Sequence, residues 1–160
     1  MPRTFFKEFV GAAVQDWRDA PGKVRAINAI TQADVMAERM FNYLKANSPA
    51  LLGKATKISE YRRDLRTRRP SLGIAWDAHD THKHGILGSH RTVRLITRGQ
   101  DPELIVRGGA IGEAPIGALP IGVYRLEMIL ELDDGTIRRL DDILTDALSA
   151  WGAELQTIGP

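Results

Sequence analysis

The residues best suited to chemistry gather in one short stretch in the middle of the chain. From Trp76 to His84 the sequence holds three of the four histidines, two aspartates and a lysine. On a helix this stretch spans about two and a half turns. An imidazole exchanges protons near neutral pH, and a positioned ammonium group stabilises charge that develops on a phosphate. His82, Lys83 and His84 are therefore the first candidates for acid–base or phosphate chemistry.

An acidic residue earlier in the chain gives His82 a candidate partner. Asp34 falls in the apolar stripe of a long helix expected from about residue 21 to residue 46, with Glu38 on its flank. His82 lies in the apolar stripe of its own helix, and a buried carboxylate and a buried imidazole each need a partner, so we expect Asp34 and His82 to meet. The contact would orient the imidazole for acid–base work, with Glu38 as a further candidate, or it would only join two helices. The sequence favours the structural role.

The opposite face of the same helix carries weak metal-ligand candidates. Asp77, Asp80 and His84 follow one another at i, i+3 and i+7, and carboxylate and imidazole groups bind divalent cations. The same spacing makes Asp80 and His84 an ordinary surface pair, and the sequence has neither an HExxH nor a paired ExxH pattern. We therefore expect no metal and no cofactor.

A basic stretch precedes the histidine-rich helix. Its seven basic residues are Lys54, Lys57, Arg62, Arg63, Arg66, Arg68 and Arg69. Such a stretch could neutralise the phosphates of a nucleic acid. The alternative is a solvated helix face in which Arg62 or Arg63 pairs with an acid. The sequence favours this alternative, because the whole chain is nearly neutral and Tyr61 is the one interleaved aromatic residue.

Hydrophobic spacing predicts helices first and strands afterwards. Helices are expected at about residues 5–18, 21–46, 55–66 and 71–86, and strands at 91–97, 103–107 and 124–132. Asp134-Gly135 is typical of a tight turn, and Asp141-Asp142 favour the start of a last helix. The Gly-rich segment 108–122 is typical of a loop, and it lacks the spacing of a phosphate-binding loop.

These elements predict an α+β fold in a single domain over residues 1–160. Residues 1–87 form a part like a four-helix bundle, and residues 88–160 a small antiparallel sheet followed by a C-terminal helix. The 160 residues, 43% of them hydrophobic, can bury a core without disulfides or a structural metal. The sequence has no cysteine, which excludes thiolate zinc sites, iron–sulfur clusters and cysteine nucleophiles.

Charge and hydropathy limit the possible partners and the cellular compartment of the protein. The net charge of +2 is the sum of about +6 over residues 1–84 and about −4 over residues 85–160. If the protein binds a polyanion, the basic stretch is the surface expected to contact it. No apolar run approaches the roughly 20 residues that span a bilayer, and the first residues lack the apolar region of a signal peptide. We therefore expect a cytoplasmic protein with no membrane partner.

Several short patterns resemble a family of small uncharacterised bacterial proteins over nearly the whole length. They are Phe5-Phe6 with Asp16-Trp17, Ala37-Glu38 with Phe41-Asn42-Tyr43, Tyr61-Arg62 with Leu65, Asp77 with Lys83-His84, and Asp133-Asp134-Gly135-Thr136 with Trp151. The resemblance supplies no catalytic residues, because it carries no known activity.

A helical bundle whose last helix ends in a Lys-His pair is also distantly similar to HEPN-type domains. This resemblance implies a metal-independent ribonuclease or a nucleotide-binding module. The hallmark of that family is an arginine a few residues before a histidine on one helix. This chain departs from it, because the nearest upstream arginine is Arg69, beyond Pro70. Arg62 or Arg63 on the neighbouring helix would have to supply the charge.

Taken together, the residues predict a non-enzymatic interaction or regulatory module that binds a protein partner or self-associates. The alternative is a HEPN-like ribonuclease or another phosphate-directed enzyme. In that enzyme His82 or His84 is the general base, and Lys83 with Arg62 stabilises phosphorane charge. The enzyme requires these groups to converge at one concave, partly open point, whereas the interaction module requires His82 to be sealed against Asp34.

Overall fold

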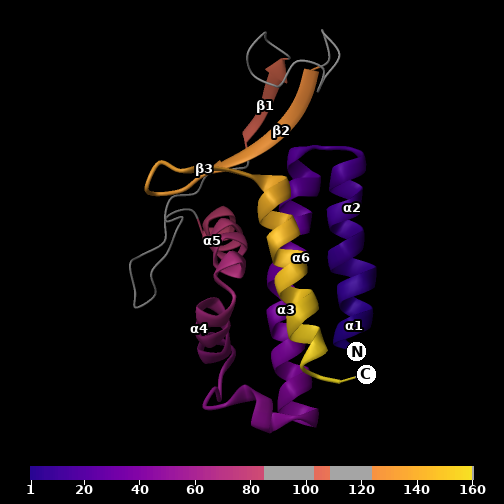
Figure 1. Cartoon of the computed structure of the whole chain (residues 1–160), viewed down its shortest axis with the longest axis vertical. Helices are drawn as coiled ribbons and strands as arrows, with labels where there is room; N and C mark the ends of the chain where they lie inside the picture. The colour runs from indigo at the N-terminus through magenta and orange to yellow at the C-terminus, as the bar shows by residue number, and fades with distance from the viewer. Residues whose placement is uncertain (85–102, 109–123, 160) are drawn as a thin grey trace.

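The computed structural model describes residues 1–84, 103–108 and 124–159. Figure 1 shows a bundle of helices with a small sheet at one end and with the two chain termini close together at the other. This arrangement confirms the predicted α+β fold class. Among the described helices, none combines the length and the apolar character needed to cross a bilayer.

The first helical rod is built from three consecutive segments. α1 (Pro2–Phe5) continues into the π-helical η1 (Phe6–Gly11) and then into α2 (Ala12–Asp19). The recurrence of Phe5, Phe9, Ala13 and Trp17 every four residues predicts one regular helix with Phe9 in its core stripe, and this detail is wrong. A π-helical segment has a wider turn than an α-helix, which shifts the residues that face the core. Val10 is therefore fully buried, whereas Phe9 is 50% exposed.

The core lies around α3 (Lys23–Asn47) and α6 (Leu140–Gln156), which run side by side through the bundle (Figure 1). Trp151 of α6 is fully buried, and its indole Nε1 donates a hydrogen bond to the carbonyl oxygen of Ala33 at 3.0 Å. The Trp151 ring also packs against Trp76, with 6.5 Å between ring centroids. The last helix belongs to the bundle, and it also contacts the strands.

Three further helical segments complete the bundle. After α3 they are η2 (Pro49–Leu52), α4 (Ile58–Arg68) and α5 (Pro70–His84). Glu60 satisfies the start of α4, because its carboxylate accepts hydrogen bonds from the backbone N–H groups of Thr56 and Lys57 at 2.7 and 3.3 Å. The hydrogen bonds from Thr56 hold the pKa of Glu60 below its ordinary value. α5 has no single apolar face, since every residue from Leu72 to Ala78 is buried.

The sheet is antiparallel and has the strand order β1 (Glu103–Gly108), β2 (Tyr124–Glu131) and β3 (Ile137–Arg139). Met128 and Leu130 of β2 are buried against the helices. The predicted tight turn is confirmed, because Gly135 adopts a φ of 81°, a conformation that favours glycine. The predicted strand at 91–97 and the Gly-rich segment beyond Gly108 lie outside the described residues.

Candidate functional site

A buried carboxylate in α3 joins three helices. Asp34 is 4% exposed, and its Oδ2 lies 2.9 Å from Nδ1 of His79 in α5. Its Oδ1 lies 2.8 Å from Nη2 of Arg62 in α4. An ionised group that loses its water must find opposite charge or hydrogen-bond donors within the fold, and the guanidinium of Arg62 supplies the opposite charge. We call these three residues the Asp34 cluster.

The predicted Asp–His contact exists, but with a different histidine. His82 is exposed near the end of α5, and His79, one turn earlier, contacts Asp34 instead. The prediction of His82 is wrong because α5 is buried on all sides over its first turns, so apolar spacing does not mark a single inner face. Burial ends at Thr81, which leaves His82 and Lys83 at the surface.

The Asp34 cluster is partly open to solvent on one side. The side chains of Arg62 and His79 are 29% and 16% exposed. The guanidinium of Arg62 also lies 5.7 Å from the centroid of the Trp76 ring, a cation–π contact. The arrangement could orient His79 for proton transfer, because Asp34 occupies Nδ1 and leaves the other ring nitrogen available. Asp34 also neutralises Arg62, so the cluster holds no uncompensated cation for a phosphate.

Asp77 is a structural residue and not a solvent-facing metal ligand. It is fully buried, and its carboxylate accepts two hydrogen bonds from Arg66 at 2.6 and 3.2 Å. Arg66 also donates to the carbonyl oxygen of Gly73 at 3.2 Å. The predicted placement of Asp77 on a wet face is wrong, because α4 packs against α5 and covers that face.

The two other metal-ligand candidates are Asp80 and His84. Asp80 is partly buried, and the side chain of His84 lies outside what the structure describes. Within the described part of the chain, no three His, Asp or Glu side chains are grouped closely enough to hold a metal ion.

A third buried acid was missed from the sequence. Glu154 in α6 is buried and pairs with Arg68 at 2.9 Å and with Arg69 at 3.0 Å. The sequence contains a feature that could have predicted it, because Glu154 interrupts the apolar stripe of the last helix between Trp151 and Leu155. A carboxylate in such a stripe indicates a buried ion pair.

Most of the basic stretch serves the inside of the protein. Four of its seven basic side chains pair with a buried carboxylate, namely Arg62, Arg66, Arg68 and Arg69. Arg63 lies 3.9 Å from Asp64, and Lys54 and Lys57 are exposed. The expected pairing of Arg62 with an acid is confirmed. Nucleic-acid binding by this stretch stays a prediction.

An apolar hollow lies between the first helical rod and α3. It has a volume of about 460 Å³, and its walls include Met1, Pro2, Phe5, Phe9, Arg39 and Tyr43. The rings of Phe5 and Phe9 stack with 4.9 Å between centroids and 14° between planes. The Arg39 guanidinium lies 5.3 Å from the Phe5 centroid. We call this the Phe9 hollow, which the sequence did not predict because the π-helical turn exposes Phe9.

Comparisons with known proteins give no match for this chain among family models, curated proteins or solved structures. The function is therefore inferred from the geometry alone. Two candidate functional sites remain. In the Asp34 cluster the carboxylate charge is neutralised by Arg62 within the fold, whereas the Phe9 hollow is open at the surface.

Proposed function

We propose that the protein is a non-catalytic interaction module that self-associates through the Phe9 hollow. The observation that carries this proposal is the stack of the exposed Phe9 on the half-buried Phe5, beside Arg39. Scattered apolar residues are normal on a protein surface, but a contiguous apolar hollow with polar residues at its rim is typical of an interaction site. Burying a half-exposed phenylalanine against a partner contributes on the order of 1 kcal/mol.

The π-helical η1 supports the choice of this surface. π-helical segments are rare, they are frequent at functional sites, and a regular helix would satisfy the backbone equally well. In this chain η1 contains Phe9, which is exposed and stacks on Phe5, whereas Val10 beside it is fully buried. The π-helical segment thus carries the exposed aromatic residue of the hollow.

Charge in and near the hollow favours a second copy of the chain as the occupant. Arg39 lines the hollow and is exposed, and the exposed Glu8 and Glu38 adjoin the lining residues Phe9 and Arg39 in sequence without lining the hollow themselves. None of these three charged groups has an ion-pair partner within the described residues. In a two-fold symmetric dimer, each contact between two residues occurs twice, once from each copy. A surface that carries both acidic and basic residues can therefore pair with the same surface of a second copy.

Analytical ultracentrifugation tests this proposal. We expect a reversible dimer of the full chain at micromolar concentrations and a monomer for Phe9→Glu, because the carboxylate would be buried in the apolar contact. Val24→Glu is the matched control, since Val24 is 82% exposed on α3 and does not line the hollow. Circular dichroism checks that both variants fold. A wild-type monomer at all concentrations, or equal dimerisation of both variants, overturns the proposal.

A second candidate function is a metal-independent enzyme that acts on RNA phosphates. The convergence of Arg62 and His79 on Asp34 favours it, because it supplies an oriented imidazole beside a guanidinium. It ranks second because Asp34 already neutralises Arg62. Structured and unstructured RNA incubated in EDTA would be cleaved by the wild type and by His82→Ala but not by His79→Ala. If the wild type cleaves RNA no faster than a protein-free control does, this candidate function is refuted.

A further inference from the structure

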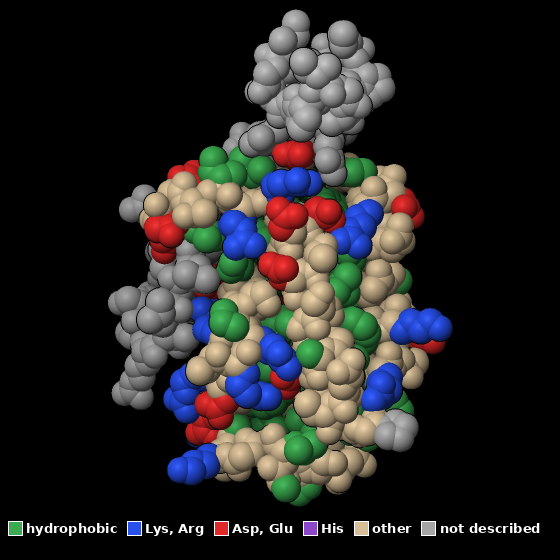
Figure 2. Space-filling view, viewed as in Figure 1, with side chains coloured by type: hydrophobic (Ala, Val, Ile, Leu, Met, Phe, Trp, Pro, Cys, Tyr) green, Lys and Arg blue, Asp and Glu red, His purple; other side chains and the backbone are tan. Residues whose placement is uncertain are grey.

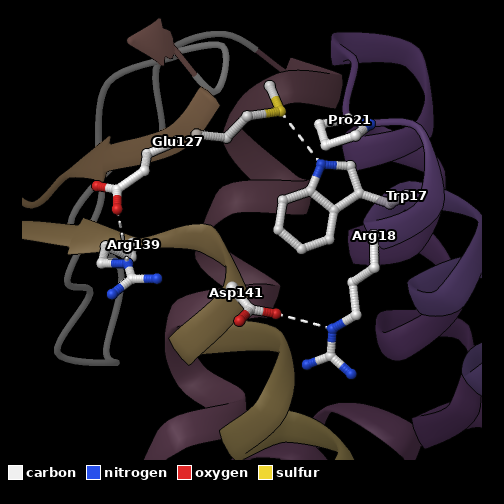
Figure 3. Close-up of a pocket in the computed structure, with 7 residues that line it drawn as sticks. Trp17, Arg18, Pro21, Glu127, Arg139 and Asp141 are labelled. Carbon is white, nitrogen blue, oxygen red and sulfur yellow. Dashed lines mark hydrogen bonds and ion pairs between the residues drawn. The ribbon is translucent and has the colours of Figure 1, made fainter. Parts of the chain in front are cut away.

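A second cavity lies where the sheet meets the bundle. It has a volume of about 210 Å³, and its walls include Trp17, Arg18, Glu127, Met128, Arg139 and Asp141. Figure 3 shows that these side chains come from α2, β2, β3 and α6 and surround one space. In Figure 2, acidic and basic side chains alternate over the first turns of α6 nearby. We call this cavity the Trp17 pocket.

The walls of the Trp17 pocket have two distinct characters. Trp17 and Met128 supply an apolar wall, and the Trp17 indole Nε1 lies 3.2 Å from the Met128 sulfur. The remaining wall carries two cations and two anions, which balance to no net charge. A lone anion such as phosphate would be repelled by Glu127 and Asp141, and a lone cation by the arginines. A small molecule with both signs of charge and a short apolar part matches this wall.

The two arginines are held very differently. Arg18 is fixed, because its Nε donates to Asp141 at 2.8 Å and its Nη2 to Thr145 at 2.6 Å. Arg139 lies 3.8 Å from Glu127 and 3.9 Å from Asp142, and it makes no hydrogen bond within the described residues. Direct N–H···O hydrogen bonds are about 2.7 to 3.2 Å long, so the Arg139 guanidinium retains donors for a carboxylate.

The size of the pocket limits the ligand. A volume of 210 Å³ equals the liquid volume of about seven water molecules. Pockets for nucleotides and drug-sized molecules are usually about 300 to 1,000 Å³. We infer that the Trp17 pocket binds a free α-amino acid with a short aliphatic side chain. Arg139 receives its carboxylate, Glu127 and Asp141 receive its ammonium group, and the aliphatic chain lies on Trp17 and Met128.

Isothermal titration calorimetry with L-alanine, L-valine and L-leucine tests this inference on the full chain. We expect saturable binding of at least one of them, accompanied by an NMR shift of the Trp17 indole N–H. Valinamide, which lacks the carboxylate, and 3-methylbutanoate, which lacks the ammonium group, should bind about ten-fold more weakly or not at all.

Two variants connect the binding to the pocket. Arg139→Gln should weaken amino-acid binding about ten-fold. Arg138→Gln is the matched control, because Arg138 pairs with Asp146 and does not line the pocket, and it should bind like the wild type. The inference is overturned if no amino acid binds saturably, if valinamide binds as well as valine, or if both variants bind equally. A monomeric wild type would refute the proposed dimer and leave this test unaffected.

Discussion

Nδ1 of His79 lies 2.9 Å from Oδ2 of Asp34, across the contact between α5 and α3. The other oxygen of the same carboxylate faces Arg62 from α4. One buried charge thus fixes the relative positions of three helices.

Asp34→Asn should lower the free energy of unfolding by about 1–3 kcal/mol, because it leaves Arg62 and His79 without their anion in a site with little water. Urea denaturation at neutral pH measures the loss. Glu38→Gln on the exposed side of the same helix is the control and should change stability by less than about 0.5 kcal/mol. Equal stability of the two variants would show that the Asp34 cluster does not hold the bundle together.

Two helical glycines should respond oppositely to alanine. A Cβ on Gly73 would lie 3.2 Å from Nε of Arg66, whose guanidinium is anchored on Asp77, whereas a Cβ on Gly152 meets nothing within 4 Å. Alanine is favoured over glycine in a helix by about 0.5–1 kcal/mol. Gly152→Ala should therefore raise the melting temperature, and Gly73→Ala should lower it.

A double-mutant cycle identifies the cause of the Gly73→Ala loss. In an Arg66→Ala background the Cβ has no guanidinium to displace, so Gly73→Ala should no longer destabilise relative to that background. An unchanged loss in this background would mean that Gly73 is required for another reason.

Tyr61 gives the protein a predictable weakness in alkali. Burial, and to a lesser degree the nearby Glu154 carboxylate, raises the pKa of Tyr61 above its ordinary value of 10.0. A raised pKa in the folded state contributes stability that is present below the unfolded pKa and is lost as the pH rises above it. Unfolding free energies measured from pH 7 to pH 11 should therefore fall more steeply for the wild type than for Tyr61→Phe above about pH 10. Parallel profiles for these two proteins would contradict the assignment.

Much of the fold follows from the sequence because it depends on local patterns. The helical spacing of the first half and the alternation along β2 reflect which residues face the core, and Gly135 provides the positive φ that the turn requires. The last helix was also predictable, but its place in the bundle was not. That place depends on Trp151 reaching Ala33 and Trp76, which are distant in sequence.

The sequence predicted a buried contact between Asp34 and a histidine, but it indicated the wrong histidine. A buried Asp34 indicated a buried partner, but choosing between His79 and His82 required knowing that α5 is enclosed on all sides over its first turns. The exposure of Phe9 depends on the π-helical η1, and no residue pattern in the sequence marked that segment. Both errors arise where regular helical periodicity does not describe the packing.

The proposed self-association is tested most directly by isotope-filtered NMR on a mixture of labelled and unlabelled full chain. Contacts detected only between a labelled and an unlabelled copy report on the interface itself. We predict intermolecular contacts to the ring protons of Phe5 and Phe9, which line the Phe9 hollow. The absence of intermolecular contacts at concentrations that should give a dimer, or contacts confined to another face, would contradict the proposal.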